Sequence, residues 1–176
     1  MKNQSSSAIC YKLLTLDDHT SIERIKELVW EYFEWGNIML KKHYGYELNI
    51  KEMMDTFISE LPFYCLIDTR LYLVFHNKTI IGLGGFKKKG SRDVELKRIY
   101  LQEEFRGNGI GKTLISNLIS DARKLEYAKM YLESADFMQK AYSLYQLFGF
   151  NKIQNYEGIE TPKDYAANIY CMELKL

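Results

Sequence analysis

The stretch Arg106-Gly107-Asn108-Gly109-Ile110-Gly111-Lys112 is the most informative part of this 176-residue chain. It lies between an extended, β-rich segment at 94–101 and a segment at 110–125 whose apolar residues recur at helical spacing. Three glycines at alternate positions allow a tight turn, and none has a Cβ that would keep a ligand away from the backbone N–H groups. The start of the following helix adds free amides and about half a positive charge. This pattern predicts a phosphate- or pyrophosphate-binding loop, with Arg106 and Lys112 as flanking cations.

Two familiar nucleotide-binding motifs fit this loop incompletely. The tripeptide Gly111-Lys112-Thr113 matches the end of a Walker A loop, but that motif needs a glycine five residues before its last one, and position 106 is arginine. A Rossmann fingerprint needs Gly-x-Gly-x-x-Gly, and its third glycine falls on Lys112 or Leu114, depending on register. A glycine-rich turn that only begins a helix is the structural alternative.

Length and composition narrow the class of protein. The chain suits one domain over 1–176, with the polar residues 1–7 as a tail. A net charge of +1 gives no sign of a nucleic-acid or membrane-surface partner. The odd, widely spaced cysteines Cys10, Cys65 and Cys171 argue against a disulfide framework, and neither they nor the histidines have metal-ligand spacing. This pattern predicts a protein of the reducing cytoplasm without a metal site. No apolar run reaches membrane-spanning length.

Hydrophobic periodicity predicts alternating short strands and amphipathic helices. The His76-Asn77-Lys78 tripeptide is typical of a hairpin, and the run Lys87–Gly90 of a solvated turn. We expect the helix that begins at Ile50 to stop at Pro62. The expected strands cover 9–16, 71–75, 79–86, 94–101, 130–132, 152–156 and 168–174, and the expected helices cover 22–40, 50–61, 110–125 and 138–148.

The strand before the glycine loop has an irregular apolar pattern. Val94 and Leu96 share one parity, whereas Ile99 and Leu101 share the other, so a regular strand would place the two pairs on opposite faces. A β-bulge near Lys97-Arg98 would return all four to one face. A strand buried on both faces, where parity carries no information, explains the pattern equally well.

Two segments of the chain resemble the motifs of the GNAT acetyltransferase superfamily. Glu95–Leu101 followed by Arg106–Lys112 resembles motif A, and Ala141–Phe150, with its Leu-Tyr-x-x-x-Gly-Phe ending, resembles motif B. The resemblance implies an α/β (mixed α+β) GNAT fold. Its central, mostly antiparallel twisted sheet has about seven strands with a splayed parallel pair in the middle, and about four helices flank it.

The resemblance also assigns a co-substrate and a set of binding residues. It implies that the chain binds acetyl-coenzyme A, with the pantetheine arm lying in the gap between the splayed strands. The implied binding residues are Ile99, Tyr100 and Leu101 for the pantetheine and carbonyl, and Arg106, Gly107, Asn108, Gly109, Ile110, Gly111 and Lys112 for the pyrophosphate. Many members have an asparagine at the place of Met138, so one coenzyme contact differs here.

Acetyl transfer to an amine needs a base and an acid. A free alkyl amine has a pKa of roughly 10, and the departing thiol one of about 8.5 by analogy with cysteine. The resemblance assigns the acid to Tyr145, which its spacing alone would make a core tyrosine with a satisfied hydroxyl. Glu95, acting through water, is our first candidate for the base, and Glu133 is the second. Either glutamate could equally be an ordinary solvated or paired acid.

The resemblance places the acceptor site in the N-terminal half, where aromatic and acidic residues crowd together. Such a mixture suits a cationic amine. An aromatic core beside a solvated acidic face would give the same composition. We predict an N-acetyltransferase acting on a primary amine of a small molecule or peptide, with homodimerisation left open. The alternatives are an acyl-CoA-binding sensor without chemistry and a nucleotide-binding protein built on Gly111-Lys112-Thr113. The residues concerned are Trp30, Tyr32, Phe33, Trp35, Tyr44 and Tyr46, with Glu31, Glu34 and Glu47.

Overall fold

The computed structural model describes residues 8–161 and 163–176. Its seven strands form one sheet in the order β1-β2-β3-β4-β5-β7-β6. Neighbouring strands are antiparallel except for β4 and β5, which are parallel, so the predicted sheet is confirmed. The strands are β1 (Ile9–Leu13), β2 (Arg70–His76), β3 (Thr79–Lys89), β4 (Asp93–Leu101), β5 (Lys129–Ala135), β6 (Asn151–Ile153) and β7 (Ile169–Lys175).

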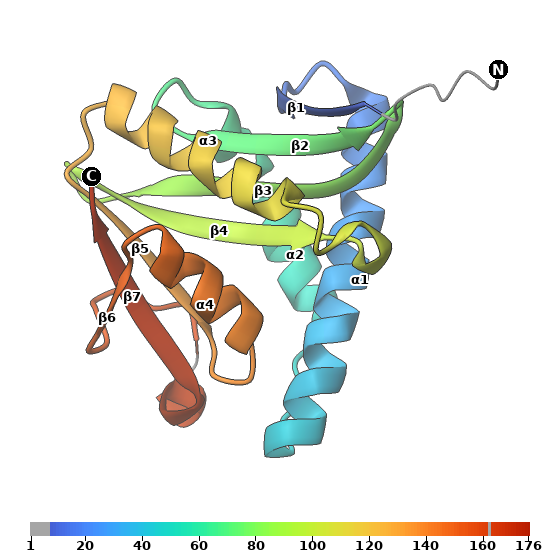
Figure 1. The fold of residues 1–176 in the computed structure, drawn as a ribbon. Coiled ribbons are helices and arrows are strands. Elements are labelled where there is room, and N and C mark those ends of the chain that lie inside the picture. The colour runs from blue at the N-terminus through green and yellow to red at the C-terminus, as the bar shows by residue number, and fades with distance from the viewer. Residues whose placement is uncertain (1–7, 162) are drawn as a thin grey trace, which may run out of the picture.

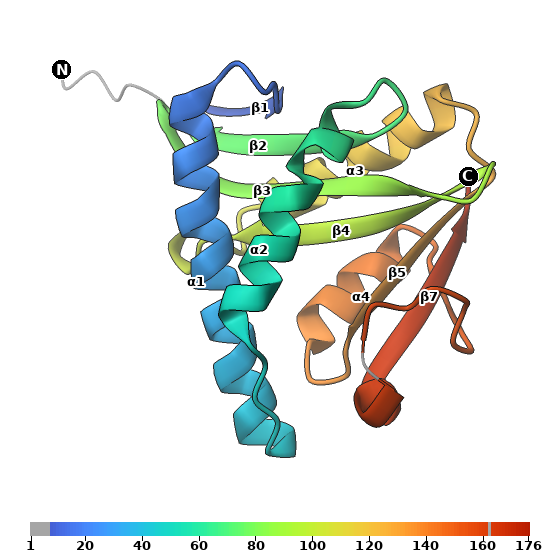
Figure 2. The same ribbon diagram turned by 180° about the vertical axis from the view of Figure 1, so that it is seen from behind.

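Four α-helices cover the two faces of the sheet, as Figures 1 and 2 show from opposite sides. One face carries α1 (His19–Tyr44) and α2 (Ile50–Glu60), and the other carries α3 (Ile110–Lys124) and α4 (Gln139–Leu147). Short 3-10 helices at Leu61–Cys65, Glu103–Phe105 and Lys163–Asn168 complete the regular structure. Within 8–161 and 163–176, no helix has the length and apolar character needed to cross a bilayer.

The long helix α1 is defined at both ends by capping groups. The Asp18 carboxylate accepts a hydrogen bond from the backbone N–H of Ser21 at 3.0 Å. At the other end Gly45 adopts a left-handed conformation (φ 73°), and its N–H bonds the carbonyl of Lys41. These caps make the helix longer than the predicted 22–40. The helix α2 ends at Glu60, close to the predicted stop, and Pro62 lies in the 3-10 turn that follows.

The β2–β3 hairpin forms as predicted, with Asn77 in the left-handed region (φ 56°). The predicted turn over 87–90 is wrong, because β3 continues through Lys89. Each lysine has a partner from a distant part of the chain: Glu60 for Lys87, Asp68 for Lys88 and the backbone carbonyl of Glu157 for Lys89. Strands β1 and β6 are shorter than the predicted 9–16 and 152–156.

A β-bulge interrupts β4, as the apolar pattern allowed. Leu83 pairs with Tyr100 and Gly85 with Lys97, so Gly84 lies opposite two residues of β4. One of them, Arg98, has a left-handed backbone (φ 59°). The bulge shifts the parity, and the four apolar residues predicted to share a face all join the core beneath α3, while Tyr100 joins the core beneath α1. Those four residues are Val94, Leu96, Ile99 and Leu101.

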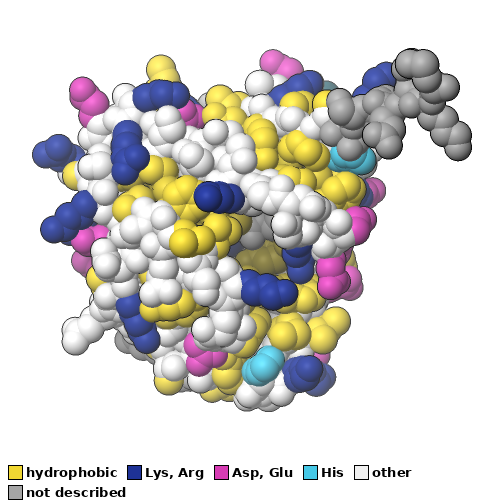
Figure 3. Space-filling view, viewed as in Figure 1, with side chains coloured by type: hydrophobic (Ala, Val, Ile, Leu, Met, Phe, Trp, Pro, Cys, Tyr) yellow, Lys and Arg dark blue, Asp and Glu magenta, His cyan; other side chains and the backbone are white. Residues whose placement is uncertain are grey.

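The parallel strands β4 and β5 separate soon after they begin. Their register pairs run only from Asp93 with Lys129 to Glu95 with Tyr131. Beyond these pairs the strands diverge, and Figure 1 shows the widening gap between them. Figure 3 shows a hollow near the middle of this face, with Lys and Arg side chains at its edge. The splayed parallel pair is therefore present, with unpaired backbone on both of its inner edges.

Candidate active site

The glycine loop is an open cradle at the start of α3. Gly107 and Gly109 have left-handed backbones (φ 83° and 78°), which only glycine adopts without strain. A Cβ placed on Gly107, Gly109 or Gly111 would have no atom within 4 Å, so the space beside the loop is free. No side chain of the described residues caps the start of α3, and its first turn has no acidic residue. These features fit the predicted anion site.

The two cations that flank the loop have different surroundings. The Arg106 Nε donates a hydrogen bond to the Leu101 carbonyl at 2.7 Å. Its guanidinium also lies over the rings of Trp35 and Tyr100, 5.7 and 5.5 Å from their centroids. Arg106 therefore ties the loop to the end of β4 and to α1. Lys112 is exposed on the first turn of α3.

Tyr145 is buried in α4, with 7% of its surface exposed. Its ring packs edge-on against Phe150, with the centroids 5.8 Å apart. Burial, with a smaller contribution from the hydroxyls of Tyr170 and Tyr32, raises the pKa of Tyr145 well above its usual value. No hydrogen bond occupies its hydroxyl within the described part of the chain. A phenol in this state keeps its proton at neutral pH and has it available to donate.

Glu95 is buried and doubly bound. Its carboxylate lies 2.8 Å from the Lys97 ammonium and accepts a hydrogen bond from the Tyr156 hydroxyl at 2.7 Å. Glu133, the second candidate for the base, is 3.4 Å from the same ammonium. The carboxylate oxygens of Glu133 also accept hydrogen bonds from the backbone N–H groups of Glu160 and Thr161. Both glutamates thus meet at Lys97.

A cavity of about 690 Å³ lies between α1, α2 and the diverging ends of β4 and β5. Its lining includes Glu133 and Glu160 but does not include Glu95. Met138 also lines it, at the N-terminal end of α4, where its sulfur accepts a hydrogen bond from the Ser134 hydroxyl. Most of the wall is apolar or aromatic and includes Tyr32, Phe33, Trp35, Leu40, Met53 and Phe137.

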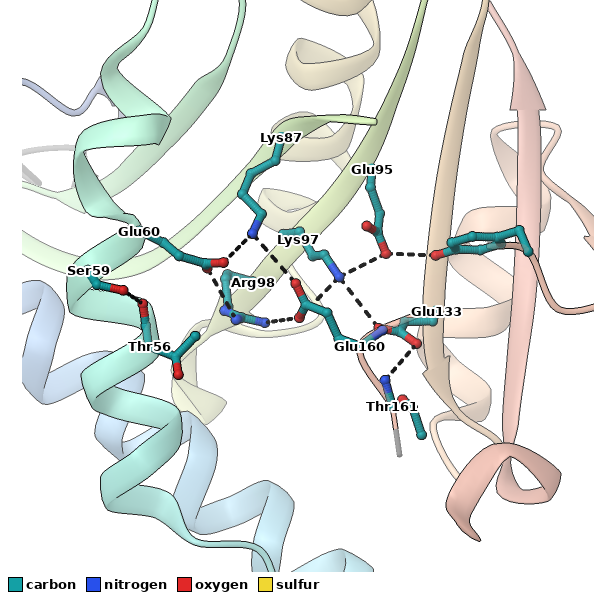
Figure 4. Close-up of polar contacts among 11 residues, drawn as sticks. Thr56, Ser59, Glu60, Lys87, Glu95, Lys97, Arg98, Glu133, Glu160 and Thr161 are labelled. Atoms are coloured by element: carbon teal, nitrogen blue, oxygen red, sulfur yellow. Dashed lines mark hydrogen bonds and ion pairs between the residues drawn. The ribbon is translucent and has the colours of Figure 1, made fainter. Parts of the chain in front are cut away.

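Charged side chains from four parts of the chain meet at the floor of this cavity (Figure 4). Lys97 and Arg98 come from the bulge of β4 and are 4% and 15% exposed. Glu160, from the segment between β6 and β7, lies 3.2 Å from Lys97 and 3.6 Å from Arg98. Lys87 of β3 lies 2.5 Å from Glu60 at the end of α2. The bulge brings both neighbouring cations of β4 into one cluster of carboxylates.

The opposite charges of this cluster stabilise each other's ionised forms. Burial disfavours the ammonium of Lys97, but the carboxylates of Glu160, Glu95 and Glu133 outweigh it and raise the pKa of Lys97. Burial likewise disfavours the Glu160 carboxylate, but Lys97, Arg98 and Lys87 hold its pKa below the usual range. Lys97 and Glu160 are therefore both charged at neutral pH.

Only part of the predicted aromatic and acidic set reaches the cavity. Tyr32, Phe33 and Trp35 line it. Trp30 is 41% exposed, Glu31 accepts a hydrogen bond from the Tyr100 hydroxyl, and Glu47 pairs with Lys41. No functional role of Lys97 and Arg98 was predicted from the sequence. Two adjacent charges stand between the apolar residues Leu96 and Ile99, but this local pattern does not indicate that they face a cavity.

Comparison with known proteins identifies the family. The model of the acetyltransferase (GNAT) family matches residues 22–150. The Escherichia coli N-acetyltransferase YjgM is 26% identical over 156 residues, covering 87% of this chain and 88% of that protein. An N-acetyltransferase of Dictyostelium discoideum is 40% identical over 62 residues, which are 35% of this chain and 29% of that protein.

The fold agrees with this result. The PaiA N-acetyltransferase of Thermoplasma acidophilum, solved in complex with coenzyme A, is similar with a TM-score of 0.67 at 19% identity. The similarity covers 96% of this chain and 99% of that one. The family match spans the bulged strand, the glycine loop and the helix of Tyr145. The chain belongs to the GNAT family of acetyltransferases.

Proposed function

We propose that this chain transfers the acetyl group of acetyl-CoA to a primary amine of a small molecule or peptide, by direct attack in a ternary complex. The main support for this proposal is that the gap between β4 and β5 and the large cavity meet at the bulge of β4. The gap between β4 and β5 leads from the glycine loop, and the 690 Å³ cavity reaches the same strand at Leu96, Lys97 and Arg98. A donor in the gap and an acceptor in the cavity would therefore come together there.

The residues along the gap suit a coenzyme A molecule. The open cradle at Gly107, Gly109 and Gly111 leaves room for a pyrophosphate beside uncapped amides of α3. We propose that Arg106–Lys112 hold the pyrophosphate and that backbone groups of Ile99–Leu101 hold the pantetheine and polarise the carbonyl. The PaiA N-acetyltransferase has the same fold and was solved in complex with coenzyme A, which supports coenzyme A as the ligand. Acetyl-CoA would supply an activated acyl thioester.

We assign the acid role to Tyr145. The thiolate that leaves the thioester needs a proton, and a phenol with a raised pKa is protonated when the reaction begins. For the base we propose Glu95, acting through water, because the carboxylate lies behind Lys97 and outside the cavity lining. Glu133 faces the cavity and is the alternative to be tested against it.

A thiol-release assay with a panel of amines tests the proposed function. Acceptor-dependent release of free coenzyme A is the expected result. Tight coenzyme binding without release from any amine would instead indicate an acyl-CoA sensor. Thermal-shift measurements with coenzyme A and ATP in competition complete the test, and preferential stabilisation by ATP would overturn the proposal. The free thiols of Cys10, Cys65 and Cys171 accord with the cytoplasm as the proposed location.

A further inference from the structure

The floor of the cavity carries a partly buried guanidinium that makes no hydrogen bond to the described residues. The Arg98 Nε has no partner among the described residues. The two terminal nitrogens of Arg98 are 3.6 Å from Glu160 and 3.8 Å from Glu60, which is too long for hydrogen bonds. The guanidinium lies over the Phe33 ring, 5.5 Å from its centroid. The charge of the guanidinium is thus balanced by carboxylates, but its N–H groups donate no hydrogen bond within 8–161 and 163–176. A guanidinium can bind a carboxylate through two parallel hydrogen bonds.

Glu160 is the carboxylate of this cluster that can most easily leave it. Its side chain is 41% exposed, against 20% for Glu60, 12% for Glu133 and 8% for Glu95. It also comes from the stretch 154–161, which contains no helix or strand. The carboxylate reaches three cations at once, at 3.2 Å from Lys97, 3.6 Å from Arg98 and 3.5 Å from Lys87. Glu160 therefore occupies a site built for a carboxylate and is the most exposed carboxylate of the cluster.

We propose, on the basis of the function proposed above, that the acceptor carries a carboxylate next to its amine and that this carboxylate binds Arg98 and Lys97 in place of Glu160. An α-amino acid or an amino-acid conjugate has this arrangement. Exchange of one carboxylate for another leaves the charge of the cluster unchanged. A polyamine would bring further positive charge beside Lys97 and Arg98 and would leave the N–H groups of Arg98 unused.

The cavity also indicates what the rest of the acceptor is like. The wall above the charged floor is aromatic and apolar, with Phe33, Trp35, Met53 and Phe137 among its residues. An amino acid with an aromatic or alkyl side chain would place that side chain against this wall, while its carboxylate rests on Arg98. Its amine would then lie beside the bulge of β4, at the position where the gap for the donor meets the cavity.

Three matched acceptors test this inference: phenylalanine, phenylalanine amide and phenethylamine. The latter two keep the aromatic ring and the amine but lack the negative charge. We expect kcat/KM for phenylalanine to exceed that of both analogues by about 10- to 100-fold, the range for loss of a charge-assisted hydrogen bond. Equal or better turnover of the analogues would overturn the inference and leave the proposed function intact. If no amine releases coenzyme A, both the inference and the proposed function are contradicted.

Two substitutions test which residues bind the carboxylate of the acceptor. Arg98→Gln should lower kcat/KM for phenylalanine by about 10-fold or more and so remove most of the preference for the free acid, because the proposed partner of the carboxylate is lost. Glu160→Gln lies outside the strand and removes the competing charge, so it should lower KM for phenylalanine. Glu157→Gln, exposed on the same segment, is the matched control and should leave KM unchanged. An unchanged KM in the Glu160→Gln variant would contradict the displacement of Glu160.

Discussion

The Glu95 carboxylate lies 2.8 Å from the Lys97 ammonium two residues further along β4, and both side chains are almost fully buried. The pairing arises because successive residues of a regular strand alternate between faces, so positions 95 and 97 share one. This pair and the Tyr156 hydroxyl hold the Glu95 carboxylate in a fixed orientation. Because that carboxylate is not part of the cavity lining, its proposed role as a base depends on a proton that arrives through water.

Glu95→Gln should lower kcat by about 100-fold or more, the usual contribution of a general base. The variant should fold, because Lys97 keeps Glu133 and Glu160 as partners. The decisive measurement is kcat at neutral pH with saturating amine. Glu133→Gln is the matched comparison. If that substitution lowers kcat by this amount and Glu95→Gln does not, Glu133 is the base.

Tyr145→Phe should reduce kcat by about 100-fold and leave the dissociation constant of coenzyme A nearly unchanged. The substitution deletes only the hydroxyl, whose raised pKa keeps it protonated through the neutral and mildly alkaline range. Calorimetric titration with coenzyme A and steady-state kinetics separate the two effects. Tyr142→Phe, on the same helix, should retain its turnover. Wild-type turnover in the Tyr145 variant would remove this residue from the mechanism.

Gly109→Ala should destabilise the fold by about 1–2 kcal/mol, because an alanine at a φ of 78° is strained. The same change should weaken coenzyme A binding by altering the backbone at the start of α3. Gly111→Ala is the control, since Gly111 lies in α3 and an added Cβ meets no atom within 4 Å. Urea unfolding should place that variant within about 0.5 kcal/mol of the wild type. Equal losses for both would argue against backbone strain as the cause.

Alanine at two other glycines should have effects of opposite sign on the free energy of unfolding. A Cβ on Gly85 of β3 would lie 2.3 Å from the carbonyl oxygen of Arg70, a backbone atom that moves only with β2. Gly85→Ala should therefore cost about 1–3 kcal/mol or more. Gly36 lies within α1 with nothing near its Cβ position, so Gly36→Ala should stabilise by about 0.5–1 kcal/mol. Thermal and urea unfolding would reveal the sign of each change.

Acid should weaken the fold through Glu160. Burial disfavours its charged form, but Lys97, Arg98 and Lys87 hold its pKa below the free value of 4.5. A group with a lowered pKa stabilises the fold above its unfolded pKa and loses this contribution as the pH falls through the folded value. The free energy of unfolding should therefore decline below pH 4.5 in the wild type and less steeply in Glu160→Gln. Parallel curves for the two proteins would contradict the ion pairs.

Features that depend on neighbouring residues could be predicted from the sequence. The glycine loop could be recognised because left-handed backbone at positions 107 and 109 requires glycine. The bulge could be inferred because the apolar residues change parity between Leu96 and Ile99. The alternative, a strand buried on both faces, could be excluded only with coordinates. The family resemblance supplied the order of strands, which periodicity alone does not determine.

Features that depend on distant partners could not be predicted. Lys87 looked solvated because its partners, Glu60 and Glu160, lie far away in the sequence. Arg98 gave no functional signal by itself, since its place in the cavity follows from the bulge together with α1, α2 and the segment before β7. No local pattern records that these four parts converge.

The short contact between β4 and β5 has a consequence for folding cooperativity. Strands β1–β4 and strands β5–β7 are two half-sheets whose backbones are joined by the pairs from Asp93–Lys129 to Glu95–Tyr131. Within each half, every strand pairs with a neighbour of the same half. A ligand that forms backbone hydrogen bonds along the gap would couple the halves, and its binding free energy would add to the stability of the whole. The donor would then be a structural element of the folded protein as well as a reactant.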